Sequence, residues 1–334
     1  MAGGREVFAV FGKKVGIDPY MIMLLGAMTL GLLLPASGAA AAVLGRVTYV
    51  AIALLFFLYG AKLEPRAIRA GFLDWKLQVF VALVTFVLFP LLCIVLSRLA
   101  GGVLRPEILM GIVFLGILPS TVQSSIAFTS IANGNVAGAI CAASISNFAG
   151  VALTPLLAAA LISSDQVEIS FDAVLRIVVQ IVLPFVAGQI VRPWIGPALQ
   201  RRRAMTLLVD RGSILLIVYS AFSAGTASGL WSEVPAMQIV IMVAAMAALL
   251  LVVLGLATFL ARASGMDAQS RIAALFCGST KSLASGLPIA ASIFPHAVLG
   301  AVVLPLMAYH MIQLLSCAAI SQRFSAKKWA ESQV

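Results

Sequence analysis

Two short polar segments interrupt long apolar stretches of this sequence. The first reads Pro-Ser-Thr-Val-Gln-Ser-Ser at residues 119–125, and the second reads Gly-Ser-Thr-Lys-Ser at residues 278–282. Hydroxyl, amide and ammonium groups in an apolar setting can bind an ion or a polar solute. A single serine more often bonds back to its own helix or joins two helices. Two clusters, one of them with a lysine, favour a binding site.

Lys281 is the one lysine or arginine that lies near the middle of an apolar stretch. A lysine at mid-membrane costs about 2.5–3.5 kcal/mol even on the lenient insertion scale. All twelve Asp and Glu residues lie in loops or at the ends of apolar stretches, so no acidic partner is available. The ammonium therefore needs a wet cavity, backbone carbonyls, an anionic ligand or loss of its proton. The alternative is a lysine whose flexible chain reaches water at a helix end.

Other polar residues lie in neighbouring apolar stretches. Asn147 shares the stretch 136–162 with Ser144 and Ser146, and a buried amide must be satisfied. His310 is either a packing residue or a proton relay. The residues expected to bind substrate or ion are Thr121, Gln123, Ser124, Ser125, Ser144, Asn147, Ser279, Thr280, Lys281 and Ser282. No catalytic residue, cofactor or metal ligand is predicted, and the four cysteines, none in a C-x-x-C spacing, are interpreted as packing residues.

The stretches that position these residues are too apolar for a water-soluble domain. The chain has 334 residues, of which 62% are apolar and 10% charged, and its mean hydropathy is +1.10. Soluble domains are about 45–50% apolar and about 25% charged. A membrane-spanning helix needs about 20 apolar residues, whereas barrel strands would alternate. We expect ten helices, at 19–35, 40–61, 77–99, 108–132, 136–162, 173–191, 213–231, 236–261, 272–294 and 296–320.

Lysine and arginine predict the orientation of these ten helices. Seventeen of the basic residues fall on the side of the two termini and only four on the other side, whose loop at 165–172 is acidic. Cytoplasmic loops carry such an excess, so we expect a multi-pass protein of the cell membrane, typical of a bacterial inner membrane, with both termini in the cytoplasm. The net charge of +10 reflects this topology, because the basic residues are too scattered for a nucleic-acid surface.

The ten helices divide into two sets of five with similar spacing. The first set covers residues 17–162 and the second residues 171–322. Because five is odd, the second set enters the membrane from the opposite side, as in an inverted repeat. The polar segments fall in the fourth and ninth helices, where Pro119 and Gly278 favour a break. The fold class we predict is all-α, a 5+5 inverted repeat whose broken helices four and nine cross at the midplane, where transporters of this kind bind substrate.

Several motifs resemble the bile acid:sodium symporter family, solute carrier family ten. They are Leu118-Pro-Ser-Thr-Val-Gln-Ser-Ser125, Asn133-Gly-Asn-Val-Ala137, Leu153-Thr-Pro-Leu-Leu157 and Gly278-Ser-Thr-Lys-Ser-Leu-Ala-Ser-Gly-Leu287. The match is closest to the branch of sodium-dependent bacterial transporters related to the seventh human member. The resemblance implies a core (77–162 and 236–320) that moves against a panel (19–61 and 173–231), with substrate between them.

The sequence departs from the family where the family binds sodium. Family members that transport bile acids have a glutamate in the broken ninth helix, but the corresponding stretch here, 279–282, contains no acid. Two further family ligands, a serine and a threonine, fall on Ala139 and Ala143, while the serine of the fourth helix is retained as Ser125. Sodium prefers oxygen ligands, as hard cations do. Either sodium or a proton is the coupling ion, and Lys281 would be counter-charge to the substrate, a surrogate cation or a proton carrier.

The sequence thus predicts a secondary transporter in the lipid bilayer. Its substrate would be a small organic anion or amphipathic acid, moved by alternating access, with sodium or a proton as the coupling ion and no cofactor. The alternative is a membrane regulatory or scaffold protein that kept the fold but lost transport. An enzyme is disfavoured because no Ser-His or paired-Asp set lies on facing helices, and a channel because no ring of charges is present. The oligomeric state stays open.

Overall fold

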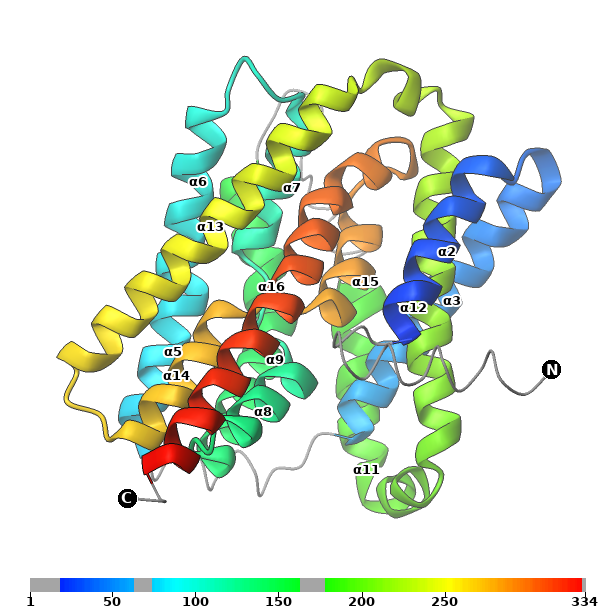
Figure 1. Cartoon of the computed structure of the whole chain (residues 1–334). Helices are drawn as coiled ribbons and strands as arrows, with labels where there is room; N and C mark the ends of the chain where they lie inside the picture. Colours follow the sequence, from blue (N-terminus) through cyan, green and yellow to red (C-terminus); the bar gives the residue numbers. More distant parts are fainter. Residues whose placement is uncertain (1–18, 63–73, 163–177, 332–334) are drawn as a thin grey trace, which may run out of the picture.

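The protein is a bundle of helices, seen here in a computed structural model (Figure 1). The structure describes residues 19–62, 74–162 and 178–331, and within these residues it contains no strand. Eight of the described helices are long and apolar enough to cross a membrane. Two shorter apolar helices, Ile22–Leu33 and Pro106–Gly116, accompany them. The prediction of an all-helical, multi-pass membrane protein is therefore confirmed.

The first half of the chain contains eight described elements. They are α2 (Pro19–Leu33), α3 (Gly38–Lys62), α5 (Trp75–Leu83), the π-helical turn η2 (Val84–Leu88), α6 (Phe89–Leu99), α7 (Pro106–Gly116), α8 (Val122–Ile131) and α9 (Val136–Leu161). Elements α5, η2 and α6 form one continuous rod where the sequence predicted a single helix at 77–99. The π-helical turn was not predicted.

The second half of the chain contains eight further described elements. They are η3 (Val178–Val182), α11 (Leu183–Arg201), α12 (Arg203–Ala227), η4 (Leu230–Glu233), α13 (Ala236–Ala263), α14 (Ala268–Ser279), α15 (Leu283–Ile293) and α16 (His296–Glu331). Helix α11 ends ten residues later than predicted, α12 begins ten residues earlier, and α16 continues past 320. These errors share a cause: hydropathy marks the part of a helix in lipid, whereas the hydrogen-bonded helix continues into its polar flanks.

Helices α2, α3, α11 and α12 pack on one another and form the right-hand part of Figure 1. Gly60 of α3 and Gly188 of α11 allow the closest approach. A methyl group on Gly60 would overlap the carbonyl oxygen of Phe185, and one on Gly188 would overlap that of Phe57. The two helices thus touch backbone to backbone, each through a glycine.

The remaining helices form the left-hand and central part of Figure 1. Helix α7 packs against α16, where a methyl group on Gly111 would overlap the carbonyl oxygen of Val302. At one end of this part, the Asp74 carboxylate accepts hydrogen bonds from Asn135 Nδ2 (3.2 Å) and Ser270 Oγ (3.1 Å). Because Asp74 caps α5 and Asn135 caps α9, this cluster ties the starts of α5, α9 and α14.

The start of α14 is fixed by Asp267, which lies between helices α13 and α14. Its carboxylate accepts hydrogen bonds from the backbone N–H groups of Gln269 (2.9 Å) and Ser270 (3.0 Å). Such a cap satisfies donors that a helix leaves unpaired at its first turn. The backbone hydrogen bond from Ser270 is the main cause that lowers the pKa of Asp267.

Candidate functional site

The first polar segment connects two helices. Helix α7 ends at Gly116 and α8 begins at Val122. Pro119 has no N–H to donate and cannot continue a helix. Ser120 does have an N–H, but it donates to Ser146 Oγ of α9 at 3.0 Å. The carbonyl oxygen of Gly116, which would pair with the Ser120 N–H in a continued helix, is therefore left without a partner from its own chain segment.

The second polar segment connects α14, which ends at Ser279, to α15, which begins at Leu283. Thr280 and Ser282 are in extended conformation, and the Ser282 side chain caps α15 by accepting from Ser285 N–H at 3.1 Å. The two segments contact each other directly. Ser282 N–H donates to the carbonyl oxygen of Pro119 (2.9 Å), and Thr121 Oγ1 donates to that of Lys281 (2.8 Å).

Three buried hydroxyl groups lie at this contact. Ser125 Oγ and Thr280 Oγ1 are 2.7 Å apart, and Ser120 Oγ lies 3.3 Å from Thr280 Oγ1. The carbonyl oxygen of Thr121 also lies within hydrogen-bond distance of Ser125 Oγ, and that of Phe276 within hydrogen-bond distance of Thr280 Oγ1. Each of these hydroxyls has one proton to share among these oxygens, and all three are fully buried rather than facing a cavity.

The Lys281 ammonium is enclosed by backbone. Its Nζ donates to the carbonyl oxygens of Gly116 (2.6 Å), Leu118 (2.7 Å) and Thr85 (3.0 Å). It also lies 4.1 Å from the centre of the Phe89 ring, a cation–π distance. The side chain has no exposed surface. An ammonium has three protons to donate, and here each finds a carbonyl oxygen.

The sequence explains why the oxygen of Thr85 is available. In the π-helical turn η2, Phe89 N–H donates to the carbonyl oxygen of Val84. The next residue, Pro90, stands five residues after Thr85, which is the spacing of a π-helical bond, but it has no N–H. Thr85 therefore lacks a donor from its own helix. Two prolines, Pro90 and Pro119, thus lie beside carbonyl oxygens that bind one lysine.

Gln313 of α16 fixes the backbone of Lys281. Its Oε1 accepts from Lys281 N–H at 2.8 Å, and its Nε2 donates to the Lys281 carbonyl oxygen at 2.9 Å. The second proton of Nε2 points at His310 Nδ1, 2.9 Å away. Because an amide nitrogen donates, this contact favours Nδ1 as the acceptor and the ring proton on Nε2; Nδ1 also lies 3.4 Å from the Lys281 carbonyl oxygen. Gln313 was not predicted from the sequence, although it is an amide inside an apolar stretch, as Asn147 is.

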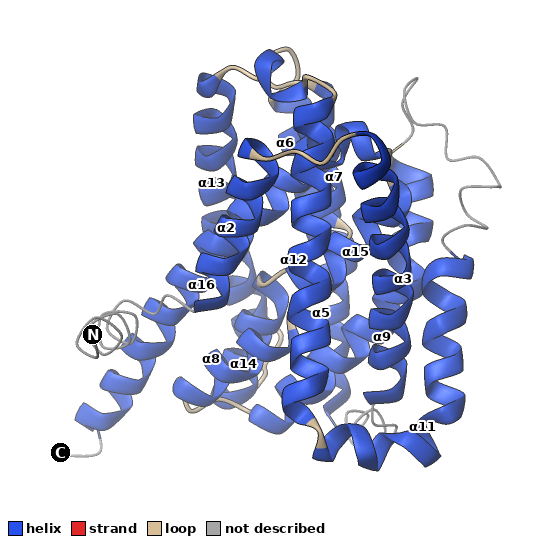
Figure 2. Cartoon of the chain, turned by 90° about the vertical axis from the view of Figure 1, so that its right-hand side faces the viewer, coloured by secondary structure: helices blue, strands red, loops and turns tan. Residues whose placement is uncertain are grey.

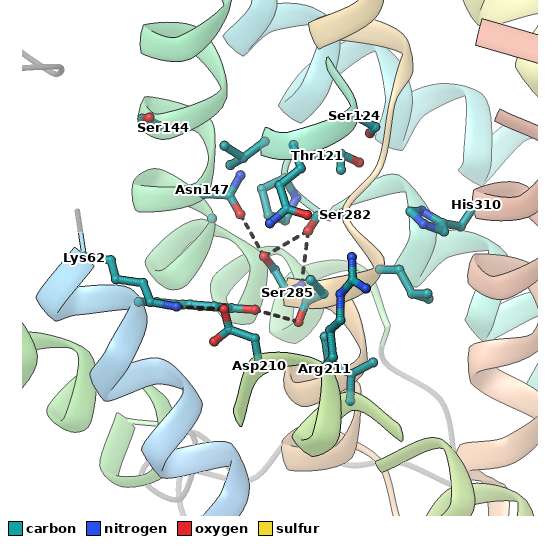
Figure 3. A pocket seen from close by; sticks show the side chains of 18 of the residues that line it. Lys62, Thr121, Ser124, Ser144, Asn147, Asp210, Arg211, Ser282, Ser285 and His310 are labelled. Atoms are coloured by element: carbon teal, nitrogen blue, oxygen red, sulfur yellow. Dashed lines mark hydrogen bonds and ion pairs between the residues drawn. The ribbon is translucent and has the colours of Figure 1, made fainter. Parts of the chain in front are cut away.

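A cavity of about 750 Å³ lies beside the two segments (Figure 3). Its polar wall contains Asn147, which links the first polar segment to α15. Asn147 Nδ2 donates to the carbonyl oxygen of Ser120 (2.6 Å), and Oδ1 accepts from Ser285 Oγ (2.7 Å). Ser285 also accepts from Ser282 Oγ at 3.0 Å. The rest of the lining is mostly apolar and includes Phe56 and Phe185. His310 lines the cavity as well.

Charged residues lie at one side of this cavity, where α3 ends (Figure 3). Lys62 Nζ and Asp210 Oδ2 form an ion pair at 2.7 Å that joins α3 to α12. The guanidinium of Arg211 lies 4.9 Å from the centre of the Tyr20 ring. None of these residues was singled out in the sequence, because each stands near the end of an apolar stretch, where charges are ordinary.

The ten predicted site residues fall into two groups. Those that line the cavity are Thr121, Gln123, Ser124, Ser144, Asn147 and Ser282. Those that lie behind it, buried in the contact between the two segments, are Ser125, Ser279, Thr280 and Lys281. Within the described residues, no three His, Cys, Asp or Glu side chains are grouped as a metal site would require.

Comparison with known proteins gives consistent matches. The model of the SBF-like CPA transporter family matches residues 18–326. The chain is 45% identical to "Uncharacterized protein PA2026" of Pseudomonas aeruginosa, over 93% of this chain and 94% of that protein. It is 41% identical to "Putative symporter YfeH" of Escherichia coli, over 92% and 93%. It is 28% identical to sodium/bile acid cotransporter 7 of Danio rerio, over 80% and 81%.

Proposed function

The chain belongs to the SBF-like CPA transporter family, and from this premise we propose that it moves an amphipathic organic anion across a membrane by alternating access. The observation that carries the proposal is the cavity of about 750 Å³ beside the contact of the two polar segments. Its size lies within the range of about 300–1,000 Å³ that is usual for small-molecule sites. Relatives named as a symporter and as sodium/bile acid cotransporters support transport over an enzymatic role.

The lining of the cavity supports an amphipathic acid as substrate. Aromatic and aliphatic side chains suit an apolar body, while Asn147, Ser285 and Thr121 offer neutral polar groups. The charged side holds two cations, Lys62 and Arg211, against one carboxylate. An anionic group is therefore favoured there. "Sodium/bile acid cotransporter" is the name of the relatives, and a bile acid is the first substrate to test.

Alternating access needs two bodies, and the packing supports a panel and a core. We assign α2, α3, α11 and α12 to the panel and the helices from α5 to α9 and from α13 to α16 to the core. The reciprocal glycines at 60 and 188 and the paired segments at 117–121 and 280–282 support a ten-helix 5+5 inverted repeat over 17–162 and 171–322. Residues 163–177, where the sixth predicted helix begins, lie outside the described residues.

The position of Lys281 supports a role as a built-in cation. Its ammonium is bound by three carbonyl oxygens, the ligand type that a hard cation prefers. It does not line the cavity among the described residues, which argues against direct counter-charge to the substrate. We therefore propose that Lys281 takes the place of one coupling cation at the contact between the segments.

A non-transporting scaffold is the weaker candidate. It has no need for a cavity with a polar wall and a charged side, and the family and its named relatives point to transport. The excess of basic residues on the side of the termini supports a bacterial inner membrane with both termini in the cytoplasm.

Reconstitution in proteoliposomes tests the proposed function. Uptake of labelled cholate and of a short organic acid would be measured with a sodium gradient, a proton gradient or neither. We expect uptake of the amphipathic acid without a requirement for sodium. Substitution of Asn147 by Leu removes the polar wall and should reduce uptake at least tenfold, whereas Gly255→Ala, on the open face of α13, should not. Absence of uptake of any amphipathic acid tested under all three conditions would contradict the proposal.

A further inference from the structure

The connection between α11 and α12 is strongly basic. Helix α11 ends at Arg201, Arg202 follows, and α12 begins at Arg203. Arg201 and Arg202 are exposed, and neither side chain makes an ion pair or hydrogen bond to the described residues. The last part of α11 turns away from its upright course and runs across the lower end of the bundle (Figure 2). Pro193 belongs to this part of the sequence, and a proline inside a helix removes a hydrogen bond and favours a bend.

A second, smaller cavity of about 310 Å³ lies beside this connection. Its lining is mostly apolar side chains from three helices: Leu54 and Leu58 of α3, Ile195 and Leu199 of α11, and Met205 and Val209 of α12. Among the described residues that line it, Arg202 is the one charged residue. Trp194, one residue before Ile195, is 74% exposed, and tryptophan is enriched where a membrane meets water.

We propose that this groove binds an anionic phospholipid. One acyl chain lies against the apolar lining, and the phosphate of the headgroup is bound by Arg201 and Arg202. Among the described residues around the groove, no acidic side chain pairs with these two exposed arginines. Charge complementarity therefore favours an anionic lipid over a zwitterionic one. Guanidinium groups suit phosphate, since their planar donors match its oxygens.

The groove and the substrate cavity share two helices. Leu58 in the groove and Lys62 at the cavity are one helical turn apart on α3. Val209 in the groove directly precedes Asp210, which pairs with Lys62. A lipid in the groove would therefore contact α3, α11 and α12 within one helical turn of the ion pair. Lipid binding is measured without any substrate, so its outcome is independent of the proposed transport.

Native mass spectrometry of the full chain tests the site. Dioleoyl-phosphatidylglycerol and dioleoyl-phosphatidylcholine have the same acyl chains and differ in charge. We expect the wild type to bind the first about tenfold more tightly, given the contribution of basic residues near anionic lipid. The double variant Arg201→Gln with Arg202→Gln should lose this preference, and Arg201→Lys with Arg202→Lys should retain most of it.

Two further variants distinguish lipid binding in the groove from lipid attraction by surface charge in general. Arg262→Gln with Arg323→Gln removes two exposed arginines elsewhere and should leave the preference within twofold of wild type. Ala198→Trp, which fills the groove, should weaken binding of both lipids at least threefold. Equal loss in both arginine pairs, unchanged binding in Ala198→Trp, or no preference in the wild type would each overturn the proposal.

Discussion

The Lys281 ammonium lies at the contact between the two polar segments, where it binds the oxygen atoms that a metal cation would bind. A bound ion can leave, whereas an ammonium on a side chain cannot, so the three carbonyl oxygens around Nζ keep their partner throughout. On the proposed role of Lys281, the protein therefore carries its own cation at this point. Removal of the lysine side chain should create a requirement for a free cation in its place.

Substitution of Lys281 by Ala should make the stability of the protein depend on sodium. Unpaired buried carbonyls cost about 1–3 kcal/mol each, and we expect the melting temperature to fall by roughly 3–10 °C. Sodium should restore part of this loss, because the vacated space offers three oxygen ligands. Melting in NaCl and in choline chloride measures the effect.

Two matched variants control this experiment. Lys281→Met fills the same space without a charge and should be destabilised but insensitive to sodium. Lys76→Ala removes an exposed lysine and should behave as wild type. If sodium stabilised the wild type as much as Lys281→Ala, the lysine would not occupy a cation site.

The tautomer of His310 is a second prediction at the scale of the residue. Gln313 Nε2 lies 2.9 Å from His310 Nδ1, and because an amide nitrogen can only donate, we expect a neutral ring with its proton on Nε2, available to a polar atom of a substrate in the cavity. The chain has two histidines, and His296→Gln leaves His310 as the only one. Long-range ¹⁵N–¹H spectra of histidine-labelled protein then report one ring.

Substitution of Gln313 by Glu provides the matched control. A carboxylate oxygen in place of Nε2 accepts rather than donates, so the proton of His310 should move to Nδ1. A proton relay through His310 would require Nδ1 to carry a proton. In the wild type, that proton would face the Nε2 protons of Gln313, which is unfavourable. Spectra with the proton on Nδ1 in the wild type would overturn this assignment.

At the scale of elements, glycines set how closely helices approach. Gly188→Ala should be strongly destabilising, because the new methyl group would overlap the carbonyl oxygen of Phe57. Overpacking typically costs about 1–3 kcal/mol, and here the obstacle is backbone, which cannot rotate away. Thermal unfolding in detergent measures the change.

Gly255→Ala is the matched control for the glycine experiment. It lies on α13, and a methyl group there meets no atom within 4 Å. Alanine also favours a helix over glycine by about 1 kcal/mol, so this variant should be equal to or slightly more stable than wild type. A loss at Gly255 as large as that at Gly188 would show that the close contact of α3 and α11 does not matter.

The sequence revealed local features well and distant contacts poorly. Pro119 and Gly278 break helical patterns, and helices do end next to both. The partners of Lys281 could not be predicted, because Thr85 lies 196 residues away and is linked to the lysine only through folding. Pro90 was a usable signal, since a proline in mid-helix leaves a carbonyl oxygen unpaired. The charged residues at the side of the cavity could not be identified from the sequence, because charges near the ends of apolar stretches are common.

At the scale of the whole molecule, the distribution of charge predicts which face is cytoplasmic. Ser232 lies in the connection from α12 to α13, and Ser264 in that from α13 to α14; both are exposed. In Figure 1 these connections lie at opposite ends of α13. A membrane-impermeant thiol reagent on intact cells should label Ser232→Cys and spare Ser264→Cys.

Controls for labelling come from the chain itself. Its four cysteines are buried, so the wild type gives the background, and permeabilised cells should label both variants. The same assay at Ser164→Cys and Arg202→Cys should label the first from outside and spare the second. The reverse pattern would mean that both termini face outward.

Alternating access requires that the panel and the core separate at one end while they close at the other. At the end near η4 they are in contact: Ser228 Oγ, directly after α12, donates to the carbonyl oxygen of Ala297 in α16 at 3.3 Å. Trp231 stacks on Phe222 at 5.1 Å and leaves no room for a methyl group on Gly300. The substrate cavity lies toward the other end, where α3 finishes. On the proposed mechanism, this arrangement corresponds to a transporter closed at the η4 end.

A covalent link across this contact should therefore stop transport. Ser228→Cys with Ala297→Cys, both at exposed positions, joined by a short methanethiosulfonate crosslinker, should reduce uptake in proteoliposomes by at least tenfold, and a reductant should restore it. The control pair Leu34→Cys with Tyr219→Cys joins two residues of the panel, where Tyr219 Oη donates to the carbonyl oxygen of Leu34 at 2.9 Å, and its crosslink should leave uptake unchanged. Because the first link crosses from panel to core and the control link stays within the panel, continued uptake in the crosslinked Ser228–Ala297 protein would mean that these two bodies do not separate at the η4 end during transport.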